Sequence, residues 1–335
     1  MKDIKLYISV LIIILSVFVS CNNDSIYNKK EIVVEQSKNV NETELLFNFI
    51  EKSGNLIDSK NTPALVLADE VYENIDNYLI IDIRDNGSYE EAHIENSINI
   101  EPNEIAKYLS VQNDLSTHKK IVLVCYAGQT ASYYATLLRF IGYGNVYALK
   151  WGISGWANSS TNEWKNNISS KYISLMEFAE NKMPEKSDYP KISTGKTNGY
   201  LIINDRVQKL ATEGFKKAKI DASTVIENSD NYYIISYLPK EVYSEGHIKG
   251  SVQYEPRKSL DRNTFLSTLP TNKPIAVYCY SGHQSSSVAA YLRILGYDAM
   301  TVVFGANSFM YQKMINDSGH AFNPQKDIAN FPTIN

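Results

Sequence analysis

Apolar residues in this chain form short unbroken runs, and between them apolar positions recur at helical spacing. The clearest runs lie within 78–84 and 121–124, where Leu, Ile and Val dominate. Continuous runs of this length are typical of strands that are buried on both faces of a parallel sheet. A helical pattern follows the second run and stops at Gly142, with its apolar positions at Tyr134, Leu137, Leu138 and Ile141.

The same patterns predict strands and helices in alternation. Expected strands lie at 64–67, 78–84, 97–100, 121–124 and 145–149. Expected helices lie at 42–52, from 69 onward, at 89–93, 104–109 and 203–211. Turns are expected at 85–88 and 152–156, where Gly, Asn, Asp and Ser gather. Alternation of this kind predicts an α/β fold, with three α/β/α layers and a mainly parallel central sheet.

One segment of the chain occurs twice. Residues 121–132 resemble residues 275–286, and their cysteines, Cys125 and Cys279, are 154 positions apart. The same offset relates two more pairs, His93 with His247 and Gly142 with Gly296. Several matches at one offset indicate a duplication. The period is too long for a solenoid repeat and suits two domains of ordinary size.

The length of 335 residues allows two domains with additional segments. Hydrophobic content of 44% and charged content of 21% are those of a globular protein, and a net charge of −4 does not favour nucleic-acid binding. The predicted division is a signal peptide at 1–20, a tether with a candidate helix at 21–61, a first domain at 62–160, a linker with a helix at 161–217, a second domain at 218–314 and a tail at 315–335.

The first 20 residues have the pattern of a targeting segment. Lys2 and Lys5 precede and flank an apolar run at 6–19, which ends at Ser20 and Cys21. A small residue before a cysteine, followed by a polar stretch, predicts a lipoprotein signal in which Cys21 carries the lipid. A single membrane anchor helix is the alternative. Both interpretations place the protein outside the cytoplasm, and the first predicts a lipid-anchored protein of the bacterial cell envelope.

The remaining two cysteines are expected to be reactive thiols. Exported proteins normally pair spare cysteines, yet Cys125 and Cys279 belong to separate predicted domains, where a disulfide between them is disfavoured. Each is predicted at the carboxyl end of a strand and the amino end of a helix, where free N–H groups stabilise a thiolate. A buried, inert cysteine is the alternative in both places. The Cys and His spacings match no metal site, and no cofactor is expected.

In the order and spacing of these segments, the chain resembles a tandem rhodanese, a sulfurtransferase family. The resemblance in the first domain rests on Ile81–Arg84, Tyr89–Ile94, Ser97–Ile100, Cys125–Gly128, Leu138, Gly142, Gly152 and Trp156. In the second domain it rests on Tyr243–Ser251, Cys279–Gly282 and Gly296. The family match spans about 62–160 and 218–314.

The resemblance implies that a cysteine thiolate takes a sulfane sulfur, forms a persulfide and passes the sulfur to a thiol or cyanide. The loop amides are then expected to keep the thiol ionised near neutral pH without a general base. The implied binding loops consist of Tyr126, Ala127, Gly128, Gln129, Thr130 and Ala131 in the first domain, and Tyr280, Ser281, Gly282, His283, Gln284 and Ser285 in the second. The implied structural support comes from Asp82, Arg84, His93 and His247.

Neither loop contains a cation, because Thr130 and Gln284 stand where the family commonly has arginine. A persulfide or polysulfide donor needs less positive charge than thiosulfate. Ala131 and Ser285 stand where related phosphatases close their loop with arginine, which disfavours phosphatase activity. His283 is expected to donate a hydrogen bond to a bound anion.

The two copies are not equivalent, because Ser236 and Leu238 replace Asp82 and Arg84. Cys125 is therefore ranked first and Cys279 second. The expected partners are a small sulfane-sulfur donor, a thiol or cyanide acceptor and the membrane. The alternative hypothesis is a non-catalytic rhodanese-like module that binds or senses a partner.

Overall fold

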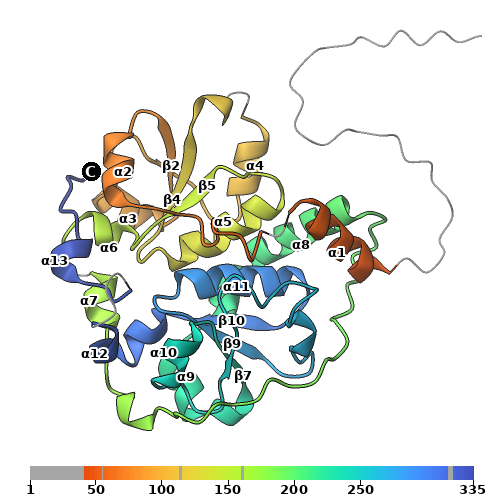
Figure 1. Cartoon of the computed structure of the whole chain (residues 1–335). Helices are drawn as coiled ribbons and strands as arrows, with labels where there is room; N and C mark the ends of the chain where they lie inside the picture. The colour runs from red at the N-terminus through yellow and green to blue at the C-terminus, as the bar shows by residue number, and fades with distance from the viewer. Residues whose placement is uncertain (1–40, 55, 113–114, 160–161, 316–319) are drawn as a thin grey trace, which may run out of the picture. The chain divides into compact units, whose positions relative to one another are not determined.

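The computed structural model describes residues 41–335, except for 55, 113–114, 160–161 and 316–319. The described residues all belong to one compact unit, Val40–Asn335 (Figure 1). The expected signal peptide, the lipidated Cys21 and most of the tether lie outside the described residues. Within the described ranges, no helix combines the length and apolar character needed to cross a membrane.

The first domain contains a five-stranded sheet in which every paired neighbour is parallel. The strand order is β1-β5-β4-β2-β3. The strands are β1 Leu65–Val66, β2 Tyr78–Asp82, β3 Ile98–Asn99, β4 Lys120–Val124 and β5 Val146–Leu149. Strand β4 lies in the centre, and the four apolar residues at 121–124 are wholly buried, as the unbroken run predicted.

The second domain repeats this sheet in the same order, β6-β10-β9-β7-β8, again with parallel pairs. The strands are β6 Lys219–Ile220, β7 Tyr233–Ser236, β8 Val252–Gln253, β9 Ile275–Tyr278 and β10 Ala299–Val302. The predicted α/β fold with two similar domains is thus confirmed.

Helices cover both sheets and fill the connections between them. The α-helices are α1 Glu42–Lys52, α2 Ala68–Glu73, α3 Asn86–Glu91, α4 Ile105–Ser110, α5 Gln129–Phe140, α6 Ile153–Trp156, α7 Glu163–Asn167, α8 Gly199–Glu213, α9 Ala222–Glu227, α10 Lys240–Ser244, α11 His283–Ile294, α12 Tyr311–Met314 and α13 Pro324–Asp327. Short 3-10 helices are η1 Leu115–Thr117, η2 Ile173–Leu175, η3 Phe215–Ala218, η4 Ser229–Asn231, η5 Leu266–Thr268 and η6 Gly305–Ser308.

The helices that follow the two cysteines, α5 and α11, pack against each other between the sheets (Figure 1). The rings of Phe140 and Tyr291 stack across this contact, with centroids 5.7 Å apart. Both helices contribute to one apolar core that includes residues of both sheets. Because each helix starts at its cysteine loop, this packing also brings the two loops to the domain boundary.

Two segments outside the repeats complete the unit. Helix α1 packs on α8, where Glu42 accepts hydrogen bonds from Thr194 and Gly195. The tail returns to the first domain: Trp156 Nε1 donates to the carbonyl of Pro332 over 2.9 Å, and Ile334 forms an antiparallel bridge with His93. The sequence showed no strong pattern in this tail, since its contacts are with residues far away in the chain.

Candidate functional site

The loop after β4 places Cys125 in the predicted ring of main-chain amides. Gly128 closes the loop in a left-handed conformation with φ of 86°, and α5 begins at the next residue. The Sγ atom accepts hydrogen bonds from the N–H groups of Gly128, over 3.1 Å, and Ala131, over 3.3 Å. The thiol is free, and the residue is 3% exposed. Partial positive charge therefore faces the sulfur at the start of the helix.

The loop after β9 repeats this arrangement around Cys279. The Sγ atom accepts hydrogen bonds from the N–H groups of Gly282, over 3.2 Å, and Ser285, over 3.3 Å. The Ser285 hydroxyl adds a contact that Ala131 cannot make, with its Oγ 3.4 Å from Sγ. This thiol is free as well, and the residue is 2% exposed. The predicted amide cradle is thus present at both cysteines.

A glycine from a neighbouring strand end supports each loop from outside. Beyond β5, Gly152 has φ of 63° and lies so close that a Cβ atom would overlap the carbonyl oxygen of Cys125. The next residue, Ile153, donates its N–H to that carbonyl over 2.8 Å. Gly305 and Ala306 repeat both contacts at Cys279. The sequence singled out Gly152 and missed Gly305, because this pair is offset by 153 residues rather than 154.

The surroundings of Cys125 do not favour its thiolate. Burial raises the pKa of the Cys125 thiol; the loop amides oppose this effect, and the carboxylate of Asp82 adds to it. The expectation that the loop keeps this thiol ionised near neutral pH is therefore wrong for the first domain. In the second domain the position of Asp82 is taken by Ser236, which is buried and uncharged.

Asp82 and Arg84 form the expected structural ion pair. Arg84 Nη2 lies 2.7 Å from Asp82 Oδ2 and also donates to the carbonyl of Ala92 over 2.6 Å. Asp82 is fully buried and Arg84 nearly so. The arginine therefore fastens the loop before His93, and its guanidinium is already committed to partners within the domain.

The two repeat histidines have the structural role that the sequence favoured. His93 Nδ1 bonds to the carbonyl of Tyr89 over 2.8 Å, and His247 Nδ1 bonds to that of Tyr243 over 2.9 Å. Each imidazole ring also stacks on the ring of the same tyrosine. These contacts hold the turn that leads into the third strand of each sheet.

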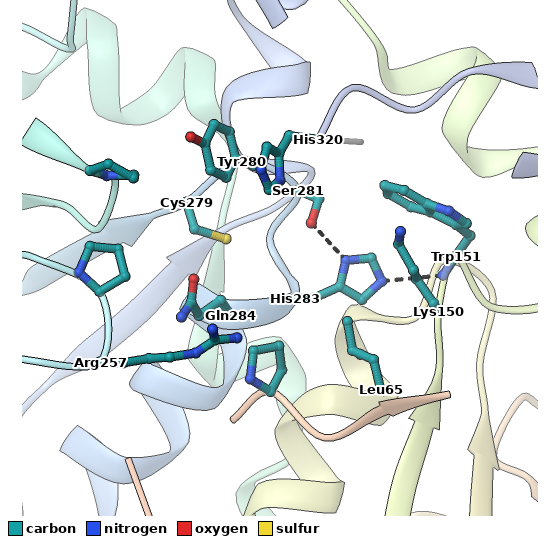
Figure 2. Close-up of a pocket in the computed structure, with 13 residues that line it drawn as sticks. Leu65, Lys150, Trp151, Arg257, Cys279, Tyr280, Ser281, His283, Gln284 and His320 are labelled. Carbon is teal, nitrogen blue, oxygen red and sulfur yellow. Dashed lines mark hydrogen bonds between the residues drawn. The ribbon is translucent and has the colours of Figure 1, made fainter. Parts of the chain in front are cut away.

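The first residues of α5 and α11 reach across the domain boundary in a reciprocal manner. Gln129 Oε1 accepts the N–H of Phe304 over 2.8 Å, and His283 Nε2 accepts the N–H of Trp151 over 3.3 Å. His283 Nδ1 lies 2.9 Å from Ser281 Oγ, so both ring nitrogens have partners (Figure 2). Burial, together with the charge of Lys150, lowers the pKa of His283 to about 3. His283 is therefore a neutral contact residue, and the expectation that it donates to a bound anion is wrong.

A cavity of about 390 Å³ leads to Cys279 from the domain boundary (Figure 2). Its lining residues are Pro63, Leu65, Lys150, Trp151, Pro239, Pro256, Arg257, Cys279, Tyr280, Ser281, His283, Gln284 and His320. The walls are mainly apolar, and two cationic side chains, Lys150 and Arg257, reach the cavity from outside the cysteine loop. Sequence analysis did not identify either residue. The signal that could have found them is their position just after β5 and β8, because strand ends of an α/β sheet line its sites.

The first-domain loop has different surroundings. A cavity of about 310 Å³ lies beside Tyr126, and its lining does not include Cys125. The Tyr126 hydroxyl contacts Asp85 and lies 2.7 Å from Ser88 Oγ. Hydrogen bonds from Tyr126 and from the N–H and hydroxyl of Ser88 lower the pKa of Asp85 to about 2. The Ala127 carbonyl accepts the indole N–H of Trp164 over 3.1 Å.

The remaining residues of the two predicted loops have different surroundings. Thr130 is the second residue of α5 and partly buried, whereas its counterpart Gln284 lines the Cys279 cavity. Tyr280 stacks on His320 with ring centroids 3.9 Å apart. Among the described residues, no cluster of His, Cys, Asp and Glu is arranged to hold a metal ion.

Two parallel α/β domains, each with a cysteine in an amide-lined loop at a strand end, define the rhodanese type of fold and site. A family model described as "Rhodanese-like domain" matches residues 67–159 and 218–308. The chain belongs to this family. Family membership supports a sulfurtransferase assignment at the level of the family.

The curated relatives match about a quarter of this chain. The thiosulfate sulfurtransferase GlpE of Shewanella oneidensis is 34% identical over 77 residues, which are 23% of this chain and 73% of that protein. The uncharacterized protein YibN of Escherichia coli K12 is 28% identical over 87 residues, which are 26% of this chain and 61% of that protein. A crystal structure of a thiosulfate sulfurtransferase from Pseudomonas aeruginosa aligns with 81% of this chain and 48% of its own, at 16% identity and a TM-score of 0.28.

Proposed function

We propose that this protein is a sulfurtransferase that carries a sulfane sulfur as a persulfide on Cys279, with Cys125 as a second and slower site. The observation that carries this proposal is the cavity that leads from the domain boundary to the Cys279 loop. The order differs from the sequence-based ranking, which put Cys125 first. It is supported by the raised pKa of Cys125 and by the acidic Asp82 beside it.

In the proposed reaction, the Cys279 thiolate attacks the outer sulfur of a donor R–S–SH. A new S–S bond forms to Cys279 as the donor S–S bond breaks, and the electron pair of that bond leaves with the thiolate R–S⁻. The N–H groups of Gly282 and Ser285 face the sulfur that carries the negative charge before the attack. An acceptor thiolate or cyanide then attacks the terminal sulfur of the enzyme persulfide and regenerates the Cys279 thiolate.

Persulfide mass spectrometry tests the proposal. Full-length protein is incubated with a low-molecular-weight polysulfide, and the added sulfur is located on cysteine peptides of the wild type, Cys125→Ser and Cys279→Ser. We expect a mass increase of one sulfur that Cys279→Ser loses almost completely and Cys125→Ser largely retains. The reverse pattern restores Cys125 to first rank. No added sulfur on either cysteine contradicts the catalytic proposal and supports the non-catalytic binding module.

We also propose that residues 1–20 are a signal peptide and that Cys21 anchors the protein to the bacterial envelope. The support is the sequence pattern alone: the lysines, the apolar run and Ser20 before Cys21. In a bacterial host, the wild type is expected in the membrane fraction with a lipid mass on its amino-terminal peptide. Cys21→Ser should lose that lipid mass. Wild-type protein whose amino-terminal peptide carries no lipid would contradict the anchor.

A further inference from the structure

The two cations at the Cys279 cavity lack acidic partners. Arg257 and Lys150 form no ion pair with any residue that the structure describes, and none of the lining residues of the cavity is acidic. Arg84, Arg262 and Arg293 are paired with carboxylates, whereas Arg139 and Arg206 donate to main-chain carbonyls. Two unpaired cations at the walls of one cavity indicate that the missing negative charge belongs to a ligand.

The backbone and side chain of Arg257 are held in place. Its φ is 61°, a left-handed value that a non-glycine residue adopts only when contacts fix it. The main-chain N–H donates to the Tyr237 hydroxyl over 2.8 Å, and Nε donates to the Thr62 carbonyl of the first domain over 3.1 Å. These bonds leave the two terminal nitrogens of the guanidinium available, and Figure 2 shows the side chain reaching into the cavity beneath Gln284.

Lys150 approaches the same cavity from the other domain. It follows β5, and its ammonium lies 4.7 Å from the centroid of the Trp151 ring, a neutral partner. Its main-chain N–H donates to the Val66 carbonyl over 2.9 Å, which ties the residue to the edge of the first sheet. The cationic pair over Cys279 is thus complete only when both domains are present.

The size and walls of the cavity narrow the class of anion. About 390 Å³ lies within the range of cavities that hold small organic ligands, whereas an inorganic oxyanion fills much less. Pro63, Pro239 and Pro256 line it together with Trp151, so its walls suit carbon atoms as well as charge. The cysteine loop itself carries no cation at the sulfur, which is where an inorganic donor would need one.

Building on the function proposed above, we infer that Arg257 and Lys150 bind carboxylates of an organic persulfide and thereby determine which sulfur donor reaches Cys279. The donor carries its sulfane sulfur at one end and carboxylates away from that end. The sulfane end enters the amide cradle, while carboxylates meet the guanidinium and the ammonium, which lie on either side of His283 in the cavity wall (Figure 2). A guanidinium donates two parallel hydrogen bonds to a carboxylate, which fixes the orientation of the donor.

A donor-charge comparison tests this inference. Glutathione persulfide carries carboxylates, and the persulfide of 2-mercaptoethanol carries none; both deliver the same outer sulfur. We expect Arg257→Gln and Lys150→Gln each to slow loading of Cys279 by glutathione persulfide about tenfold. Loading by the mercaptoethanol persulfide should change less than about twofold. Arg257→Lys, which keeps the charge but not the two parallel hydrogen bonds, should retain more of the preference for the charged donor than Arg257→Gln and less than the wild type.

Lys258→Gln is the matched control, because Lys258 is exposed, adjacent to Arg257 and outside the cavity lining. It removes the same net charge and should leave the rates of Cys279 loading by both donors nearly unchanged. Added salt should slow wild-type loading by the charged donor more than loading of the Arg257→Gln, Lys150→Gln double variant.

The outcomes separate this inference from the proposed function. Wild type that takes sulfur equally from both donors, with no change in Arg257→Gln, overturns the inference and leaves the function standing. Variants that slow both donors equally also overturn it, because they indicate a structural effect on the loop. Wild type that takes sulfur from neither donor overturns the proposed function itself.

Discussion

At the scale of single residues, two nearly identical cradles hold sulfurs with different neighbours. Each Sγ accepts two main-chain hydrogen bonds of similar length, so the amides do not distinguish the two sites. The difference lies beneath the loop, where Asp82 disfavours a thiolate at Cys125 and the neutral Ser236 occupies the same place under Cys279. The same acid binds Arg84, so the pair that stabilises the first domain also opposes ionisation of its cysteine.

The loop glycines provide a stability test at this scale. Gly128 has φ of 86°, and a Cβ atom there would overlap His283 Nε2 and lie 2.9 Å from the Leu149 carbonyl. We expect Gly128→Ala to lower the free energy of unfolding by about 2–4 kcal/mol, from the left-handed strain and the displaced interdomain contact. Urea unfolding measures it. Gly144→Ala is the control, since no atom lies within 4 Å of its added Cβ, and it should cost less than about 1 kcal/mol. Equal losses in the two variants would contradict the close approach.

At the scale of elements, the sequence pattern predicted the strands and helices that depend on contacts between neighbouring residues. The runs at 78–84 and 121–124 became β2 and β4, and α1 has the predicted bounds, with Asn41 accepting the N–H of Glu44 at its start. The structure differs where a helix start was taken for a turn. Asp85 caps α3 through the N–H of Ser88, so the helix starts at Asn86 within the expected turn at 85–88.

The candidate site could likewise be predicted only where its residues are contiguous in the sequence. Both cysteine loops followed from the repeat, because strand, loop and helix are contiguous in sequence. The cavity did not, since Lys150 and Arg257 are 107 positions apart and meet only through the packing of two domains. The sequence predicted α8 only over 203–211 and showed no pattern in the returning tail, for the same reason: α8 packs on α1, and Phe331 stacks on Tyr72 with centroids 4.1 Å apart.

At the scale of the whole molecule, the two loops depend on each other. Gln129 and His283 occupy equivalent positions at the starts of α5 and α11, and each accepts an N–H beside the glycine that supports the opposite loop. Trp151 and Phe304, the donors, both have left-handed backbones, with φ of 67° and 59°. Displacing either contact therefore disturbs the residue next to Gly152 or Gly305, and through it the other cysteine loop.

This dependence predicts that His283 makes stability sensitive to acid. Its pKa of about 3 in the folded protein lies far below the ordinary value of 6.5, because burial and Lys150 disfavour the charged ring. Between these values the unfolded chain binds a proton that the folded protein does not, so stability is lost as pH falls below 6.5. By pH 4.5 the loss from this one group is on the order of 2 kcal/mol.

Replacement of His283 by glutamine isolates this effect, because Gln129 shows that glutamine fits the equivalent position. We compare the free energy of unfolding of His283→Gln with that of the wild type at two pH values. We expect the variant to be more stable, relative to the wild type, at pH 4.5 than at pH 7.5. Denaturant unfolding followed by the fluorescence of Trp151 and Trp164 measures both, since these rings lie 5.3 and 5.8 Å from the imidazole. Gln129→Ala removes the reciprocal bond without a titrating group, so it should lower stability by about 1–3 kcal/mol at both pH values. A variant His283→Gln that loses stability toward acid as steeply as wild type would show that the domain boundary does not hold this histidine neutral.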